Sequence, residues 1–175
     1  DSTNHFIQGT NNTGGSDTFV QGTNNIAIQN SISQGVSNSA SYNSIAQGNS
    51  NTASYYSIAQ GDSNSSLNTA FTFGSANTAN QNSVAFGQNC YAKNNSFAFG
   101  SASRALDNSI AIGIGARASG QKVVLGYYPE THNATDTTVF AVGYGDDSNR
   151  RDVINYRKTG VFTLKTSGDK DLSIN

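Results

Sequence analysis

Three tyrosines are the residues whose types and spacing best suit ligand recognition. Tyr42 and Tyr55 are separated by a spacing that recurs along much of the chain, and Tyr56 follows directly, all among asparagines and serines. A tyrosine ring offers flat apolar area with one hydrogen-bonding group, a combination that binds neutral sugars and protein loops. Tyr127 and Tyr128 form a second pair. We predict that these five tyrosines belong to a binding surface. The alternative is that the rings stack on each other, cover turn backbone or lie between chains.

Groups that could support catalysis or metal binding are sparse. The only two histidines, His5 and His132, lie far apart in the chain, and both are expected to be surface polar residues. Glu130 is the only glutamate, so the paired carboxylates of glycoside hydrolysis are not evident. We therefore predict no enzyme activity, no metal site and no cofactor.

The spacing of the first two tyrosines reflects an internal repeat. The pentapeptide Ser-Ile-Ala-Gln-Gly occurs at 44–48 and again at 57–61. The glycine of this pentapeptide recurs every thirteen residues through ten copies, and an eleventh copy follows after a longer interval. These structural glycines are Gly9, Gly22, Gly35, Gly48, Gly61, Gly74, Gly87, Gly100, Gly113, Gly126 and Gly143.

Other columns of the repeat indicate strands and turns. A large residue, a small residue and a large residue precede most of these glycines, as in Ile45-Ala46-Gln47, and this alternation is typical of a strand. Glycine permits a turn with positive φ, and asparagine or serine side chains can hydrogen-bond turn backbone. Thirteen residues, the length of one repeat, supply roughly 43 Å of extended chain, enough for two short strands and two turns. Each repeat is therefore predicted to be one coil of an all-β solenoid.

The motif Asn-Ser-[Val/Ile]-Ala-[Ile/Phe]-Gly, present at 82–87 and 108–113, makes a family resemblance specific. It resembles the head repeat of trimeric autotransporter adhesins, also found in phage and virus tail-fibre proteins. The resemblance covers roughly residues 5–126. It implies a left-handed parallel β-roll and a homotrimer that binds a host-cell surface glycan or protein receptor. It also implies an extracellular location, on a virion fibre or a cell surface.

Composition narrows the range of partners. Only 12% of residues are charged, the formal net charge is −1, and few of these charges precede Arg104. This distribution lacks the basic footprint of a nucleic-acid-binding protein. No apolar run approaches the length of a membrane span, so no membrane insertion is expected. A passive fibre spacer and an ice-binding solenoid remain alternatives to a receptor-binding fibre.

The repeat is interrupted after residue 126. We predict a β-roll domain at 1–126, and at 127–175 a final rung with an inserted loop followed by a small fibre module. Within this module we expect strands near 139–142, 152–156 and 161–165. The sequence from Val139 to Leu164 resembles the β-module that follows such rolls in phage and virus fibre proteins. The basic pair Arg150-Arg151 is expected to pair with Asp146, Asp147 and Asp152, or to bind an acidic glycan.

Two predictions concern the strand that ends in each glycine. The large residues are expected to fill the roll, and the alanine face to contact a neighbouring chain, although the residues do not exclude the reverse. The glutamines directly before the first five glycines, at 8, 21, 34, 47 and 60, are expected to form a hydrogen-bonded ladder.

Overall fold

The computed structural model describes residues 4–146, 148–165 and, as backbone, 171–174. The described residues form strands and turns and contain no helix. They build about 11 turns of a parallel β-solenoid with rungs of about 13 residues, which confirms the all-β prediction. Two compact units divide the chain, at 1–89 and 90–175. The domain boundary predicted from the sequence, between residues 126 and 127, stays a prediction, because it describes where the repeat is interrupted and not where these units divide.

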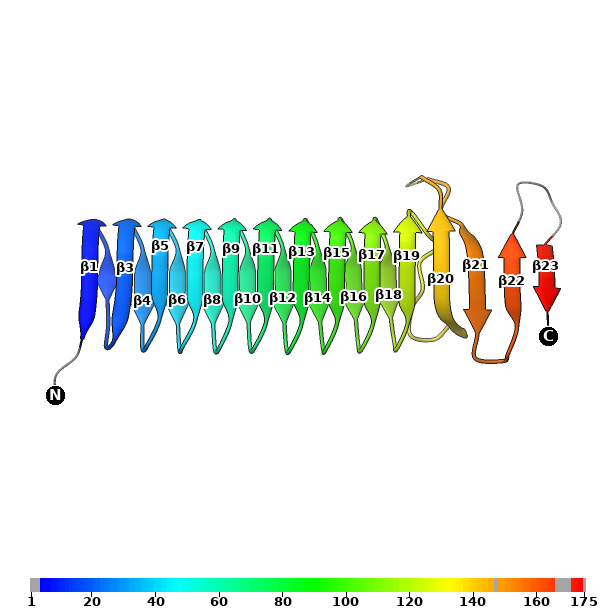
Figure 1. The fold of residues 1–175 in the computed structure, drawn as a ribbon, viewed down its shortest axis with the longest axis horizontal. Coiled ribbons are helices and arrows are strands. Elements are labelled where there is room, and N and C mark those ends of the chain that lie inside the picture. The colour runs from blue at the N-terminus through cyan, green and yellow to red at the C-terminus, as the bar shows by residue number, and fades with distance from the viewer. Residues whose placement is uncertain (1–3, 147, 166–170, 175) are drawn as a thin grey trace. The chain divides into compact units, whose positions relative to one another are not determined.

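In the first unit, long and short strands alternate (Figure 1). The long strands pair in parallel in the order β1-β3-β5-β7-β9-β11-β13, and the short strands in the order β2-β4-β6-β8-β10-β12. The long strands are β1 His5–Thr10, β3 Thr18–Thr23, β5 Ile32–Val36, β7 Ile45–Asn49, β9 Ile58–Asp62, β11 Phe71–Ser75 and β13 Val84–Gln88. The short strands are β2 Thr13–Gly14, β4 Ile26–Ile28, β6 Ser39–Ser41, β8 Thr52–Ser54, β10 Ser65–Leu67 and β12 Thr78–Asn80.

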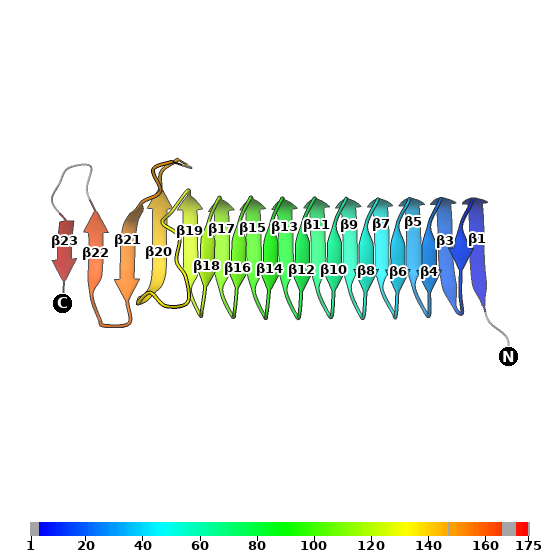
Figure 2. The same ribbon diagram turned by 180° about the vertical axis from the view of Figure 1, so that it is seen from behind.

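The second unit continues this pattern and then changes direction (Figure 2). Its short strands are β14 Tyr91–Lys93, β16 Arg104–Leu106 and β18 Arg117–Ser119. Its parallel long strands are β15 Phe97–Ser101, β17 Ile110–Ile114, β19 Val123–Tyr127 and β20 Thr138–Tyr144. The strands β21 Asp152–Arg157, β22 Phe162–Lys165 and β23 Asp171–Ile174 then pair antiparallel.

The end of the repeat matches the sequence prediction closely. Gly143 pairs in register with Gly126, and Phe140 with Val123, so the eleventh copy is a true rung despite its insertion. The strands expected near 152–156 and 161–165 correspond to β21 and β22. The remainder of the predicted module, 166–170 and 175, lies outside the described residues, as does Asp147 in the expected acidic group.

The predicted assignment of the strand faces is wrong. Ala46, Ala59 and Ala85 are completely buried inside the coil, whereas Ile45 and Gln47 lie on its outer surface. Ala40 and Ala53, from the short strands, meet Ala46 and Ala59 in the interior. A coil closed by so few residues brings its two sheets too close together for large side chains. The alanine face therefore forms the core and cannot contact a neighbouring chain.

An asparagine ladder lines the same interior. Asn51 Nδ2 donates to the carbonyls of Gln47 (3.0 Å) and Gly61 (2.8 Å), and Asn51 Oδ1 accepts from the backbone N–H of Asn64 (3.0 Å). The ladder satisfies buried backbone groups at the corner of each rung, as such groups require. It contains Asn12, Asn25, Asn38, Asn51, Asn64 and Asn77.

The structure confirms the predicted glutamine ladder, on the outer face. Each glutamine after Gln8 donates from Nε2 to Oε1 of the glutamine one rung earlier, with distances between 2.7 and 3.0 Å. The chain at the glycine corner is equally tight: a Cβ at Gly48, where φ is +119°, would lie 2.0 Å from the carbonyl oxygen of Gly61. Only glycine fits there, which explains the strict glycine column.

Candidate functional site

The first candidate site is a corner of the first unit that carries Tyr42, Tyr55 and Tyr56. Tyr42 and Tyr55 stack face to face, with ring centroids 4.6 Å apart and planes 5° from parallel. Tyr56 is the most exposed of the three, at 63%. The repeat thus brings Tyr42 and Tyr55 together as the spacing predicted, and their rings adopt the stacked arrangement given above as the alternative to a binding surface. Because their inner faces cover each other, a ligand can reach only their edges, their outer faces and the Tyr56 ring.

The backbone of this corner is held in an unusual conformation. Tyr42, Tyr55 and Tyr56 have φ values of 54°, 57° and 59°. The left-handed region favours glycine and asparagine, and for a bulky residue it costs on the order of 1 kcal/mol or more. Other rungs place asparagine here, as at Asn94 and Asn95. Tyrosine is therefore not the residue type that this backbone conformation favours, although the stacking of Tyr42 on Tyr55 offsets part of the cost.

The same corner is rigid because its backbone is paired from rung to rung. Tyr55 N–H donates to the carbonyl of Ser41 (3.2 Å), and Tyr56 N–H donates to the carbonyl of Tyr42 (2.9 Å). An aromatic surface on a fixed backbone loses little conformational freedom on binding. The tyrosine corner, defined as Tyr42, Tyr55 and Tyr56, is therefore a pre-organised surface.

A second aromatic cluster lies in the second unit. The predicted residues Tyr127 and Tyr128 meet edge to face, with centroids 5.0 Å apart. The sequence prediction missed Tyr144, which lies 6.1 Å from Tyr127 and is 69% exposed. Arg150, which the sequence analysis assigned to the basic pair, also belongs to this cluster, because its guanidinium lies 5.1 Å from the centre of the Tyr128 ring. The pairing of Gly143 with Gly126 places Tyr144 beside Tyr127. Aligning the eleventh repeat with the tenth would therefore have predicted this contact.

The second unit also encloses a buried polar cluster that the sequence did not predict. Lys122 stands in a column otherwise occupied mainly by serine, and its Nζ contacts Asp136 Oδ1 at 3.0 Å. Nζ also donates to the carbonyls of Asp136 and Thr138, both at 2.8 Å. His132 is buried beside it, so its expected surface position is wrong. The inserted loop turns back so that His132 bridges to Ala118 and extends the short-strand sheet.

Ion pairs account for the burial of His132. Its Nε2 lies 2.8 Å from Asp152 Oδ2, and its Nδ1 lies 3.5 Å from Asp136 Oδ2. Burial lowers the pKa of His132, but the hydrogen bond to Asp152 and the surrounding carboxylates outweigh it and raise the pKa above 6.5. Burial opposes ionisation of Asp136, but its bond to Lys122 holds the pKa below 3.8. Paired in this way, the buried charges stabilise the end of the coil.

Asp152, one of the three carboxylates expected to pair with Arg150 and Arg151, has other partners, while Asp147 lies outside the described residues. Asp152 is buried and accepts hydrogen bonds from Asn155 Nδ2 (2.8 Å) and the backbone N–H of Glu130 (3.1 Å). Arg150 instead donates to the carbonyl of Gly115 at 2.5 Å. Among the described residues, no three His, Cys, Asp or Glu side chains gather into a group that could hold a metal ion.

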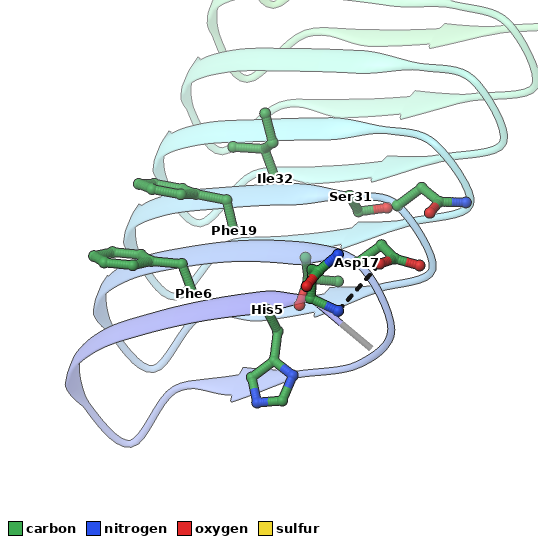
Figure 3. A pocket seen from close by; sticks show the side chains of 9 residues that line it. His5, Phe6, Asp17, Phe19, Ser31 and Ile32 are labelled. Atoms are coloured by element: carbon green, nitrogen blue, oxygen red, sulfur yellow. Dashed lines mark hydrogen bonds between the residues drawn. The ribbon is translucent and has the colours of Figure 1, made fainter. Parts of the chain in front are cut away.

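A hollow of about 600 Å³ lies at the first turns of the first unit (Figure 3). Phe6, Phe19 and Ile32 follow one another on successive turns, and His5 points away from the two rings. The Phe6 and Phe19 rings stack with centroids 4.9 Å apart. The polar contact drawn there, from the backbone N–H of Asn4 to Asp17 (3.2 Å), joins neighbouring coils. The hollow is wide open and its polar groups do not converge on a common point.

Large apolar side chains cover the outer face of the long strands. In the first unit Phe6, Ile32, Phe71 and Phe86 are between 36% and 48% exposed. In the second unit Phe99 and Ile110 are exposed to a similar degree. In the first five rungs these side chains lie beside the glutamine ladder on the same face. Exposed apolar side chains gathered on one face often mark a protein interface.

Fold and surface together define a class of protein. The chain is a parallel β-solenoid of about 13-residue rungs, with a small-residue core, an outer apolar face and exposed aromatic corners. Comparison of the chain with protein-family models, curated proteins and solved structures finds no match. Within the part of the chain that the structure describes, no helix is long and apolar enough to cross a membrane.

Proposed function

We propose that this chain is a segment of a homotrimeric fibre or adhesin, located extracellularly on a virion fibre or a cell surface. In this proposal the tyrosine corner binds a host-cell glycan or a protein loop. The single observation that carries it is the placement of three exposed tyrosines on left-handed backbone. The rung backbone there is fixed, so the rings are presented at little entropic cost.

The outer apolar face supports the homotrimer. Each rung contributes a large apolar residue in the column of Phe71. The rungs from Phe73 onward add a second apolar residue in the column of Phe86, where the first five rungs carry the glutamine ladder. Three copies packed through this face would bury the apolar area and leave the corners exposed. A trimer would also repeat the tyrosine corner threefold, so that weak single sites act together by avidity. The alanine face is unavailable for this contact because it lies inside the coil.

Changing a single side chain tests the assembly. Phe86→Asp places a charge in the apolar face, and we expect it to convert trimer to monomer in analytical ultracentrifugation. Thr52→Asp introduces the same charge on the exposed outer face of β8 and should leave the trimer intact. A trimer that persists in the Phe86→Asp protein would show that the contact lies elsewhere.

Replacing the corner tyrosines tests binding. The triple variant Tyr42→Asn, Tyr55→Asn, Tyr56→Asn suits the left-handed backbone better than tyrosine does, so the coil should remain folded. We expect it to lose attachment to host cells and binding to an array of neutral glycans. Tyr156→Asn, at an exposed tyrosine of β21, is the matched control and should bind like the wild type.

The passive spacer is the competing function, and the same assays separate the two. A spacer predicts that wild-type trimer binds neither cells nor glycans. Undiminished attachment by the triple variant would remove the tyrosine corner from consideration and direct attention to the cluster of Tyr127, Tyr128 and Tyr144.

A further inference from the structure

Basic side chains gather on the outer face of the short strands in the second unit. Arg104 of β16 pairs in register with Tyr91 of β14 on one side and with Arg117 of β18 on the other. Lys93 lies on the same face, because the intervening Ala92 and Ala105 point into the core. We call Lys93, Arg104 and Arg117 the cationic face. It lies on the sheet opposite the one that carries the outer apolar face.

Two arginines in register on neighbouring parallel strands are energetically unfavourable. Their Cα atoms lie about one strand spacing apart, near 4.8 Å, and like charges facing each other destabilise a sheet. Among the described residues, neither arginine forms an ion pair. The carboxylate of Asp107 is engaged by Asn94 Nδ2 (2.6 Å) and Ser119 Oγ (3.2 Å). Within the described part of the chain, no carboxylate pairs with these two arginines, and an anionic ligand would offset their repulsion.

A hollow adjoins the two arginines. It has a volume of about 240 Å³ and is lined by Arg104, Arg117, Ser119, Thr131 and Asn133, among others. The volume falls below the 300–1,000 Å³ typical of pockets for drug-sized ligands, and it suits a single sugar unit. Hydroxyl and amide groups along its wall can bond sugar hydroxyls. The inserted loop supplies Thr131 and Asn133, so this hollow exists only where the repeat is interrupted.

We propose that the cationic face binds an acidic polysaccharide, with one carboxylated or sulfated sugar unit seated in this hollow. Arg104 and Arg117 take the anionic group, since the planar guanidinium matches carboxylate and sulfate oxygens in a bidentate arrangement. Ser119, Thr131 and Asn133 bond the ring hydroxyls. Lys93, one strand further, meets the charge of a neighbouring sugar unit.

The geometry favours a saccharide over a nucleic acid. Single strands bind through bases stacked on open aromatic rings, but the guanidinium of Arg104 lies over the Tyr91 ring, 5.4 Å from its centre. Duplex binding needs a broad basic footprint, and the chain as a whole carries a net charge of −1. This inference does not depend on the tyrosine corner, because it concerns different residues in the other unit.

Calorimetry on the full chain tests the proposal with four probes at equal salt. These are a sulfated oligosaccharide, an oligogalacturonate, a neutral malto-oligosaccharide of the same length and a duplex DNA oligonucleotide. We expect binding of at least one acidic saccharide and none of the neutral one. The variant Arg104→Gln, Arg117→Gln should weaken that binding about 100-fold, from roughly ten-fold for each charge-assisted contact. The variant Arg157→Gln, Lys158→Gln removes two exposed charges elsewhere and should bind like the wild type.

The unliganded variant supplies a second readout. Removing two facing like charges should leave the melting temperature of Arg104→Gln, Arg117→Gln equal to that of the wild type or higher, so that lost binding does not reflect unfolding. The proposal is overturned if wild type binds neither acidic saccharide, or if the double variant retains its affinity. Equal loss in the control variant, or duplex DNA binding as tightly as the saccharide, overturns it too.

Discussion

Replacing Asn51 by alanine tests whether the asparagine ladder stabilises the coil. Asn51 is completely buried, and its side chain serves the carbonyls of Gln47 and Gly61 and the backbone N–H of Asn64. Alanine would deprive three backbone groups of that partner. A buried polar group left without a partner costs about 1–3 kcal/mol. We therefore expect a loss of at least about 3 kcal/mol in the free energy of unfolding.

Thermal unfolding followed by circular dichroism measures this loss. For a chain of this size, 1 kcal/mol corresponds to about 2–4 °C, so the melting temperature should fall by about 6–12 °C. Asn49→Ala is the control, because Asn49 is exposed and its side chain bonds only exposed side chains among the described residues: it donates to Asp62 (2.9 Å) and accepts from Ser50 Oγ (3.3 Å). It should change stability by no more than about 0.5 kcal/mol.

The second unit indicates a substitution of Asn51 whose effect on stability should be intermediate. Ser103 occupies the asparagine column there and donates to the carbonyls of Phe99 (3.2 Å) and Gly113 (2.7 Å). Asn51→Ser should therefore preserve part of the bonding and fall between wild type and Asn51→Ala. A melting temperature for Asn51→Ala within about 1 °C of wild type would refute the view that the ladder stabilises the coil.

Three further predictions concern the core, the corner and the buried ion pairs. Ala46→Leu should unfold the coil or lower its melting temperature strongly, because the completely buried site has no room for a larger side chain. Gly48→Ala should be at least as damaging, since its Cβ would meet backbone; circular dichroism showing a soluble, folded Gly48→Ala protein would contradict this. His132 has a raised pKa when folded, so its contribution to stability is complete below pH 6.5 and is lost as pH rises through the folded pKa. Melting temperature should thus fall between pH 6 and pH 9 in wild type and fall less in His132→Gln; equal slopes would contradict this.

Much of the architecture followed from periodicity alone. Glycines at a constant spacing predicted the rungs, the alternation before each glycine predicted the long strands, and the copy at Gly143 predicted the last rung. The glutamine ladder was also readable, because a fixed repeat in a parallel solenoid stacks identical positions directly on each other. The pairing of Tyr42 with Tyr55 follows from the same register.

Only the tertiary structure decided which strand face is inside. Alternation specifies that Ala46 and Ile45 point in opposite directions, but not which direction leads into the coil. The answer depends on the separation of the two sheets, which is set by corners with one or two left-handed residues and by the asparagine ladder. Those features leave room mainly for small side chains such as alanine, serine and threonine, so the large apolar residues turn outward.

The break in the repeat was beyond the sequence for a related reason. Lys122, His132 and Asp152 look like isolated surface charges in the chain, yet they are buried together where the inserted loop folds back. The separations of these three residues in the sequence do not match the length of the repeat, so their contacts leave no periodic signal. The sequence by itself determined what repeats, while the structure decided what the repeat encloses and how the chain closes it, because both depend on distances between segments that no spacing encodes.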